Sequence, residues 1–332
     1  MPRHCAVAPD IMPRVHSHWL IVGLVAWTVS QAAGAQPYPA RNITFVVPFA
    51  AGGVADVIAR IVAQKLGERT GWKLIVENRG GAGGNVGARM VSAAEGDGYT
   101  VLATSTALAV NATTSRNRGY AVEDFKAVAV VASTPDVLAV HPSNPAKSLP
   151  EFIANAKDTT ITFGSSGMGT TPHIATEYLL RELAKLDVTH VPFSGGAPAV
   201  SAALGNHVDL LSASLPTAIS QINDGALRAL GVAAARRAPS VPNVPTYSES
   251  GYPNLYSATW IGFFVPAQTP GSVVSRLNAE INEALTGADV PQKLQSIGFD
   301  VITTTPAEAT DYFKSEVANW GKMARAIGFS TD

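Results

Sequence analysis

Three glycine-rich segments could bind an anion, because each follows a short run of β-branched residues and precedes a helical pattern. They read PFAAGGVAD (48–56), SSGMGTTPH (165–173) and VPFSGGAPA (191–199). Glycine lets the backbone turn sharply and approach a ligand closely. The first turn of a helix presents unpaired N–H groups and a positive dipole end, which suit a carboxylate or a phosphate. Together the three segments predict an anion-binding site formed by neutral hydrogen-bond donors.

Hydroxyl groups accompany the glycines in these segments and at one more strand end. The second segment has Ser165, Ser166, Thr170 and Thr171 beside Gly167 and Gly169, and the third has Phe193 and Ser194 beside Gly195 and Gly196. A fourth candidate, ATSTALAVN (103–111), adds Ser105, Thr106 and Asn111. Asp56 is different, because a carboxylate in contact with an anion would repel it. Its expected roles are to cap the helix, to hold a water or an ammonium group, or simply to start the helix.

Motifs for nucleotide binding and for bond-breaking chemistry are incomplete. GGAGGNVG (80–87) has Val86 where G-x-G-x-x-G needs its third glycine, and no P-loop lysine or H-E-x-x-H occurs. GSSGMG (164–169) has Met168 where G-x-S-x-G needs glycine. A dyad of Ser165 or Ser166 with His173 stays open as a hydrolase alternative. We otherwise expect no catalytic residue, no metal and no cofactor.

The first 35 residues predict an export signal that is cleaved. Two arginines precede the apolar run WLIVGLVAWTV (19–29), which is short for a membrane span, and AGA (33–35) offers small residues for cleavage before Gln36. A single membrane anchor is the alternative. Cys5, the one cysteine of the chain, lies in this leader, so we expect no disulfide in the mature protein.

The rest of the chain is close to electrically neutral. The sequence has 24 Lys+Arg and 25 Asp+Glu, of which the leader holds two and one. No basic run or polybasic face occurs, so nucleic acid is excluded as a partner. With no other apolar segment of membrane length, the sequence predicts a soluble, exported, monomeric protein.

Strand and helix patterns alternate along the mature chain. Expected strands at 43–49, 73–78, 100–106, 161–166, 188–193, 208–214 and 227–234 are separated by helical patterns, which predicts an α/β fold with mainly parallel sheets flanked by helices. Two β-rich segments, 124–142 and 258–270, contain no helix. We interpret them as two crossover strands between two lobes, rather than as part of two tandem domains.

This arrangement predicts two α/β lobes, the first of which is discontinuous. The expected bounds are 36–135 plus 256–332 for lobe 1 and 136–255 for lobe 2, with the ligand cleft between them. Open parallel sheets bind ligands at the carboxyl ends of their strands. The three glycine-rich segments would therefore face the cleft.

A set of motifs in fixed order resembles one family. YPARNITFVVPFAAGGVADVIARIVAQKL, VENRGGAGGNVGA, DGYTVLATST, FGSSGMGTTPH, THVPFSGGAPAV, DLLSASLPTAI, LRALGVAAARRAPSVPNVPTYSESGYP, ATWIGFFVPAQTP and LNAEINEAL run from about Tyr38 to the C-terminus. They are similar to the substrate-binding receptors of tripartite tricarboxylate transporters, the Bug family. The resemblance implies a two-lobed, type II-like periplasmic binding protein fold. It also implies a periplasmic receptor, not an enzyme, that captures a small organic carboxylate and delivers it to integral membrane permease subunits. A ligand-sensing receptor for a signalling partner is a further alternative.

The resemblance also implies which residues bind the carboxylate. They are Pro48, Phe49, Ala50, Ala51, Gly52, Gly53 and Asp56 in the first loop, Ser165–Thr171 with His173 in the second, and Ser194–Ala197 in the third. The family often has an aromatic residue and an acid or amide before LP, where this chain has Ser212, Ala213 and Ser214. We therefore expect Ser214 to lie in a wider cleft. The amino group of an amino-acid ligand would have no acidic partner there, which disfavours that class of ligand. We expect Gly53→Val to abolish binding with little loss of fold.

Overall fold

The computed structural model describes residues 1, 2, 4, 6, 38–287 and 289–331. The predicted leader therefore lies outside the described residues, apart from four positions near its start. The part of the chain that begins at Arg41 forms one compact unit. Among the described helices, none combines the length and the apolar character that crossing a bilayer requires.

Three parallel strands form the first part of the sheet. They are β1 (Ile43–Val47), β2 (Leu74–Asn78) and β3 (Thr100–Ser105), with β1 between the other two. Helices α2 (Val54–Thr70) and α3 (Asn85–Ser92) follow β1 and β2, as the alternating pattern predicts. Helix α2 ends at Gly71, whose φ of 74° is left-handed and favours glycine.

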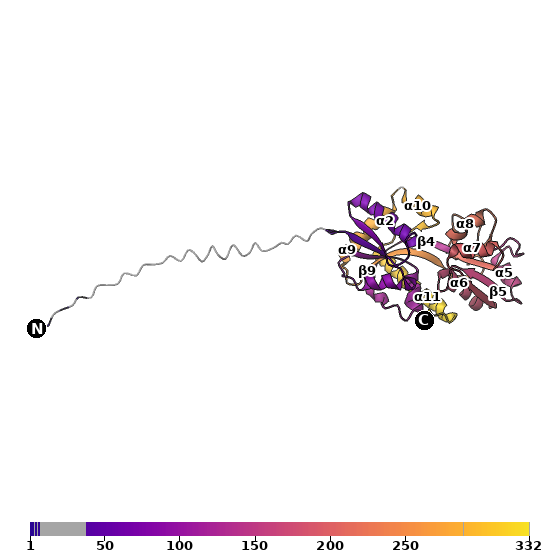
Figure 1. The fold of residues 1–332 in the computed structure, drawn as a ribbon, viewed down its shortest axis with the longest axis horizontal. Helices are drawn as coiled ribbons and strands as arrows, with labels where there is room; N and C mark the ends of the chain where they lie inside the picture. Colours follow the sequence, from indigo (N-terminus) through magenta and orange to yellow (C-terminus); the bar gives the residue numbers. More distant parts are fainter. Residues whose placement is uncertain (3, 5, 7–37, 288, 332) are drawn as a thin grey trace. The chain divides into compact units, whose positions relative to one another are not determined.

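One long strand continues this sheet into a second region (Figure 1). Strand β4 (Phe125–Val140) pairs through its first eleven residues with the antiparallel β9 (Ala258–Pro266), which lies beside β3. Beyond Asp136 it pairs instead with β7 and β8. The two β-rich segments 124–142 and 258–270 therefore form the predicted pair of crossover strands. We call the strands beside β9 sheet region A and those beside β7 sheet region B.

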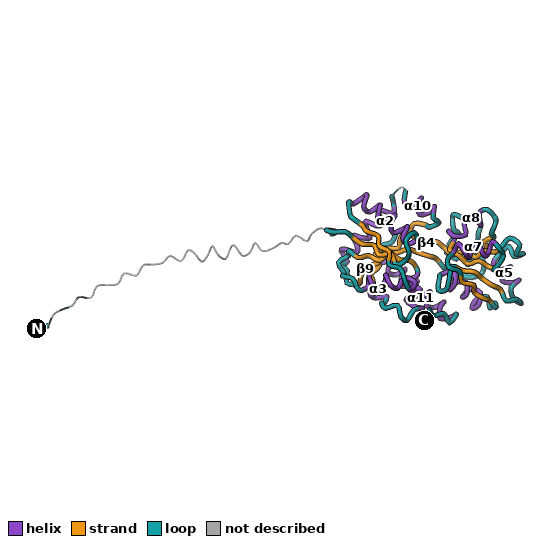
Figure 2. Tube along the Cα trace, in the orientation of Figure 1, coloured by secondary structure: helices purple, strands orange, loops and turns teal. Residues whose placement is uncertain are grey.

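Sheet region B repeats the alternation of strands and helices. Its strands are β5 (Ile161–Ser165), β6 (Val188–Pro192), β7 (Leu210–Ser214) and β8 (Arg228–Val232). Its helices are α5 (Leu149–Asn155), α6 (Thr171–Glu177), which continues through η3 (Tyr178–Leu183), α7 (Gly196–Leu204) and α8 (Leu215–Asn223). Strand β5 is parallel to both β6 and β7. Figure 2 shows the strands of each region flanked by helices.

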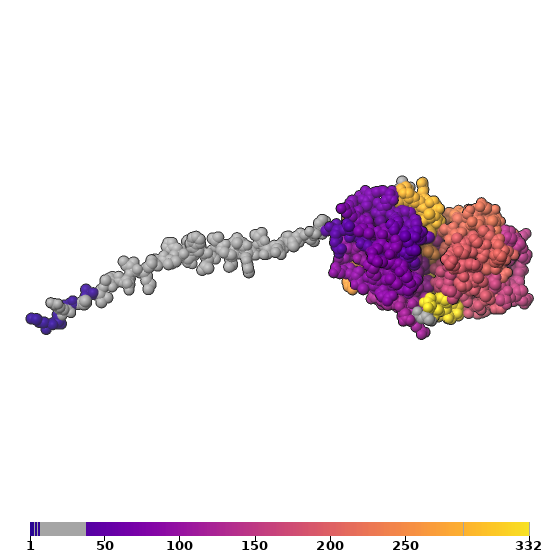
Figure 3. Space-filling model, viewed as in Figure 1, coloured from indigo at the N-terminus to yellow at the C-terminus, as the bar shows by residue number. Residues whose placement is uncertain are grey.

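The C-terminal part of the chain returns to sheet region A. It contains α9 (Gly271–Leu285), α10 (Val290–Ser296), β10 (Asp300–Val301) and α11 (Pro306–Ala326). Helix α11 packs against α4 (Ala107–Thr114), a helix that was not among the elements expected from the sequence. Residues Phe329–Thr331 then run between the two regions, where Figure 3 shows the yellow C-terminal residues between purple and pink surfaces.

Candidate functional site

A cavity of about 620 Å³ lies at the carboxyl ends of strands from both sheet regions. Strand β1 leads into Phe49, β3 into Thr106 and β5 into Ser166, while β7 ends at Ser214, and these four residues all line the cavity. Helices α4 and α6 begin at residues that line it, and α8 begins directly after Ser214. Their exposed N–H groups and positive dipole ends favour a negatively charged ligand.

Among the residues that the structure describes, none with a charged side chain lines the cavity. Its twelve hydroxyl or amide residues are Asn85, Ser105, Thr106, Asn111, Ser115, Asn117, Ser166, Thr170, Thr171, Ser214, Thr259 and Thr331. The other lining residues are Phe49, Ala82, Gly83, Ala107, Val110, Met168, Gly169 and Pro172. Neutral donors of this kind can bind a carboxylate without the cost of burying a lysine or an arginine. The apolar residues leave room for a hydrocarbon segment.

The first loop, 48–53, contributes one lining residue and is held by Asp56 behind it. Phe49 lines the cavity, whereas Pro48, Ala50, Ala51, Gly52 and Gly53 are outside the lining. Asp56, which is 2% exposed, accepts a hydrogen bond of 2.8 Å from the Gly52 N–H and bonds to Arg60 at 3.0 Å. Asp56 thus positions the loop rather than contacting the cavity.

Asn78 ties this loop to the neighbouring strand. At the end of β2, its Nδ2 atom donates to the Phe49 carbonyl at 3.1 Å and to Asp56 at 2.9 Å. Burial by itself would raise the pKa of Asp56, but the hydrogen bonds from Arg60, Gly52 and Asn78 hold it below its ordinary value. Asp56 is therefore ionised at neutral pH, and the loop is fixed by a charged centre.

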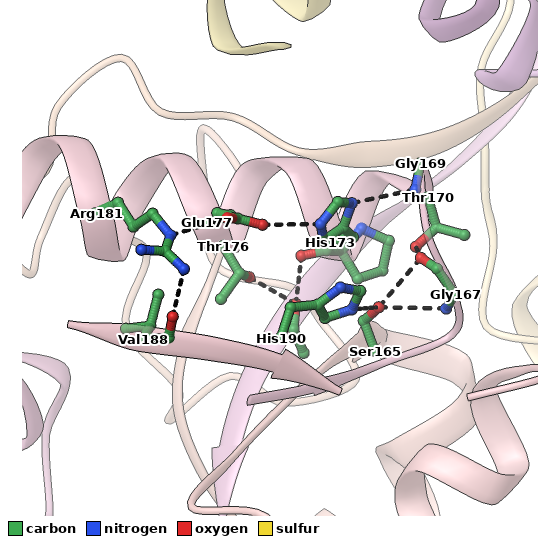
Figure 4. A network of polar contacts seen from close by, with 12 residues as sticks. Ser165, Gly167, Gly169, Thr170, His173, Thr176, Glu177, Arg181, Val188 and His190 are labelled. Carbon is green, nitrogen blue, oxygen red and sulfur yellow. Dashed lines mark hydrogen bonds and ion pairs between the residues drawn. The ribbon is translucent and has the colours of Figure 1, made fainter. Parts of the chain in front are cut away.

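The second loop divides its residues between the cavity and a buried layer beneath it (Figure 4). Ser166, Gly169, Thr170 and Thr171 line the cavity, as does Met168. Ser165 is fully buried, and its Oγ atom lies 2.7 Å from His190 Nε2 and accepts a bond of 3.2 Å from the Gly167 N–H. The predicted ligand residues Ser165 and Gly167 are thus supporting residues of this loop.

His173 also lies beneath the loop, not in the cavity. It is 1% exposed, its Nδ1 atom accepts a bond of 3.1 Å from the Gly169 N–H, and its Nε2 atom lies 2.8 Å from Glu177. Glu177 bonds in turn to Arg181 at 2.9 Å. The Ser165–His173 pairing of the hydrolase alternative is therefore not formed, because His173 is engaged by Gly169 and Glu177.

His173, Glu177 and His190 bring possible metal-binding atoms within 4.8 Å of one another. The two imidazole rings are stacked, with centroids 4.0 Å apart and planes 24° apart. A bound metal lies in the plane of each imidazole that coordinates it, and two nearly parallel planes do not meet between the rings. The stacking favours a hydrogen-bonded support over shared coordination.

The third predicted loop lies away from the cavity lining. Phe193, Ser194, Gly195, Gly196 and Ala197 are all outside the set of lining residues. Phe193 supports the second loop instead, since its N–H donates to the Ser165 carbonyl at 3.0 Å. A side chain at Gly196 would approach Thr217 to 2.8 Å, so this glycine is explained by helix packing.

The floor of the cavity lies where β4 passes from one sheet region to the other. Ser214 Oγ donates to Asp136 at 3.1 Å and lies 3.2 Å from Thr259 Oγ1, which is 3.4 Å from Thr171 Oγ1. Ser257 Oγ also donates to Asp136. Burial raises the pKa of Asp136 to about 6, although hydrogen bonds from these hydroxyl groups lower it.

Several lining residues were outside the predicted site. Thr259 and Thr331 come from the crossover strand and the C-terminal tail, and Asn85 and Asn117 come from a helix start and a turn. By contrast, Ser105, Thr106 and Asn111 of the segment 103–111 were candidates from the sequence, and all three line the cavity. Residues 107–111 of that segment belong to helix α4, whose N-terminus faces the cavity.

Residues 58–329 match the model of one family, the tripartite tricarboxylate transporter family receptor. The chain belongs to this family. It is 36% identical over 327 residues to the UPF0065 protein in the tcbD-tcbE intergenic region of Pseudomonas sp. (strain P51), covering 96% of this chain and 97% of the relative. The protein BugT of Bordetella pertussis (strain Tohama I) is 33% identical over 316 residues, covering 93% and 96%.

Three solved structures are similar along nearly their whole length. R. palustris Rpa4515 with adipate has a TM-score of 0.74 and 31% identity, covering 88% of this chain and 99% of that chain. The periplasmic binding protein BugD has a TM-score of 0.71 and 30% identity, with the same coverage. MatC (Rpa3494) from Rhodopseudomonas palustris with bound malate has a TM-score of 0.71 and 30% identity, covering 86% and 99%.

These matches confirm the predicted family and the two-lobed α/β fold. The family is one of periplasmic binding proteins whose receptors take small carboxylates and work with membrane transporters. Sheet regions A and B correspond to the cores of the two lobes, and the cavity receives residues from both.

Proposed function

We propose that this protein is a periplasmic receptor that captures a small organic carboxylate in the cavity and delivers it to the integral membrane permease subunits of a tripartite transporter. The observation that carries the proposal is the uncharged cavity lined by hydroxyl and amide groups beside the first turns of helices. Its volume is within the range of small-molecule sites, on the order of 300–1,000 Å³. Adipate and malate in similar structures support the carboxylate class.

The proposed lobes are residues 36–135 with 256–332 and residues 136–255. This division falls where β4 exchanges its partner β9 for β7 and β8. Phe49, Ser105 and Thr259 would then contact the ligand from lobe 1, and Ser166, Thr170, Thr171 and Ser214 from lobe 2. We further propose that the leader is removed near Ala35/Gln36 and that the mature receptor is a monomer.

A thermal-shift screen of purified mature protein tests carboxylate capture. The panel holds adipate, malate, citrate, benzoate and glutamate, with the matched neutral compounds adipamide and benzamide as controls. Because a ligand that binds the folded state alone stabilises it, we expect at least one acid to stabilise the protein by about 2.7 kcal/mol at 100 times its Kd. No stabilisation by any acid, or equal stabilisation by its amide, would contradict carboxylate capture.

The hydrolase alternative finds little support in the geometry of the serines. Ser165 is fully buried and bonds to His190, and the two histidines nearest the second loop are stacked on each other beneath it. A nucleophile must be open to its substrate and within reach of an oriented base. We expect no labelling by a fluorophosphonate probe; labelling that Ser166→Ala removes would revive the enzyme hypothesis.

A transport receptor and a signalling receptor would both bind the acid, so measurements of uptake, not of binding, distinguish the two roles. If the receptor serves transport, deletion of its coding sequence should abolish concentrative uptake of the radiolabelled acid that gives the largest thermal shift, and re-expression should restore it. Unchanged uptake together with a changed transcriptional response to that acid would favour the signalling role.

A further inference from the structure

A buried histidine, His173, and a half-buried one, His190, lie directly beneath the part of the second loop that lines the cavity (Figure 4). His173 comes from α6 and His190 from β6, and their rings stack at a centroid distance of 4.0 Å. Phe163 stacks on His190 at 4.8 Å, and Phe329 meets His173 edge-on at 5.0 Å. The pair is thus enclosed by aromatic rings, so its polar contacts are confined to a few directions.

Each histidine holds a different glycine amide of the loop. His173 Nδ1 accepts the Gly169 N–H directly at 3.1 Å. His190 acts through Ser165, whose Oγ atom lies 2.7 Å from His190 Nε2 and 3.2 Å from both the N–H and the carbonyl of Gly167. Gly167 and Gly169 have φ values of 132° and 74°, which other residues rarely adopt, so these bonds fix an unusual backbone.

The hydrogen bonds identify which nitrogen of each histidine carries the proton. His173 Nδ1 accepts from Gly169, so its proton is on Nε2 and is donated to Glu177. His190 Nδ1 is buried and has no partner among the described residues. A buried N–H without an acceptor is costlier than a bare nitrogen, so the proton of His190 belongs on Nε2, which donates to Ser165.

We propose that Ser165, His173, Glu177 and His190 form a support that positions residues 166–171 for ligand binding, with His190 and His173 as the positioning residues. The role in binding rests on the proposed function, whereas the role in holding the loop does not. Glu177 orients His173, and Arg181 fixes Glu177 from the far side by a bond of 2.9 Å. None of the four residues of the support lines the cavity.

Ser165 and His190 have different roles in this support. Substitutions of each residue can distinguish the two roles. Glutamine at position 190 places an amide N–H near the position of Nε2 and can still donate to Ser165, whereas leucine fills the site without a donor. Ser165→Ala removes the acceptor of the Gly167 N–H and leaves both histidines in place. His207→Leu is the control, because His207 is exposed and lies outside the support.

Amide hydrogen exchange of the free protein, followed by mass spectrometry on peptides that cover 164–174, tests the positioning without any ligand. Loss of one hydrogen bond of ordinary strength should speed exchange in this peptide by about 5- to 10-fold in His190→Leu and in Ser165→Ala. His190→Gln should stay within about 2-fold of wild type, and His207→Leu should match it. Peptides from α9 serve as the measure of global stability.

Three outcomes would overturn the proposal. The first is unchanged exchange in both His190→Leu and Ser165→Ala, and the second is equal acceleration by His190→Gln and His190→Leu. The third is acceleration spread evenly over α9 and the loop, which would mean loss of global stability instead of loss of positioning. If His190→Leu does not fold, Ser165→Ala decides by the same peptides.

Isothermal titration with adipate connects the loop to binding. If the wild-type protein binds adipate, His190→Leu should raise the Kd by about 10-fold and His190→Gln by about 2-fold or less. Equal affinity of wild type and His190→Leu would show that the loop does not act in binding. Absence of adipate binding by wild type concerns the ligand of the proposed function, and the exchange experiment then decides the positioning by itself.

Discussion

Two aspartates that are buried to nearly the same degree respond to burial in opposite directions. Asp56, behind the first loop, is 2% exposed, and Asp136, at the crossing between the lobes, is 1% exposed. Hydrogen bonds from Arg60, Gly52 and Asn78 outweigh burial and hold the pKa of Asp56 below its ordinary value. Burial dominates at Asp136 and raises its pKa to about 6.

The difference lies in the donors that each carboxylate receives. Asp56 accepts from a guanidinium, an amide side chain and a backbone N–H, all of which favour the ionised form. Asp136 accepts from the hydroxyl groups of Ser214 and Ser257, and Glu316 adds a repulsive charge. Burial alone therefore does not decide the charge of a carboxylate; the balance between burial and the donors around it does. Asp56, which holds the first loop, is thus permanently charged at neutral pH. Asp136, where β4 passes from one sheet region to the other, is titratable.

Replacing Asp136 by asparagine should give the largest effect, and the effect should depend on pH. The folded protein retains the proton of Asp136 between the ordinary value of 3.8 and about 6, whereas the unfolded chain loses it. This group thus contributes stability at low pH that is lost as pH rises through 6. Relative to wild type, Asp136→Asn should gain about 2.4 kcal/mol in the free energy of unfolding between pH 4 and pH 7.

Urea denaturation of wild type and Asp136→Asn at half-unit pH steps measures this difference, since the titration of all other groups cancels. Asp224→Asn, a substitution of the same kind on an exposed turn after α8, is the matched control. A difference between wild type and Asp136→Asn that does not vary with pH would mean that the pKa of Asp136 is not raised.

Asp56→Asn should have the opposite dependence and a smaller size. The pKa of Asp56 is lowered in the folded state, so its stabilising contribution is present at neutral pH and is lost as pH falls through that lowered value. At pH 7 we expect a loss of about 2 kcal/mol, because an amide cannot accept from all three donors.

Arg60→Gln separates the ion pair from the other hydrogen bonds of Asp56. The Arg60 side chain is 51% exposed, so its attraction to Asp56 is screened by water and the variant should lose less than about 1 kcal/mol. A loss as large as that of Asp56→Asn would instead make the ion pair, and not the bonds to Gly52 and Asn78, the main stabilising feature of the first loop.

The order of strands and helices was predictable because alternation of short apolar runs and amphipathic helices is a local property. Helix α4 was not predicted, since serine, threonine and asparagine in 103–111 are weak helix formers. Packing of α11 from the far end of the chain stabilises α4. Long-range packing therefore overrides local propensity at this edge of the cavity.

The loops of the site could be located from the sequence, but not the direction of their side chains. Ser165 and Ser166 are equivalent in the sequence, yet one is buried under the loop and the other lines the cavity, because successive residues at a strand end face opposite sides. His190 gave no signal, as its partner Ser165 is 25 residues away. Thr259 and Thr331 reach the cavity by the crossover and the C-terminal return, which no local pattern encodes.

Gly52→Ala should have a smaller effect than Asp136→Asn or Asp56→Asn, and it tests how Asp56 acts on the first loop. Gly52 has a φ of 81°, and its N–H donates to Asp56, whereas Gly53 has an extended backbone with a φ of −69°. Alanine at position 52 should cost about 1 kcal/mol, and alanine at position 53 less than half of that. From the sequence, Gly53 was expected to be the more important glycine of the pair. The backbone conformation instead requires glycine more strictly at position 52.

A double-mutant cycle in urea denaturation shows whether Asp56 imposes this conformation. If the bond from Gly52 to Asp56 holds φ positive, the cost of Gly52→Ala should fall to near zero when Asp56 is already asparagine, because the loop is then free to relax. Additive costs would mean that the loop adopts its shape without Asp56, and Asp56 would then stabilise α2 rather than the ligand loop. The same cycle built from Gly53→Ala should be additive, since Gly53 needs no special backbone conformation.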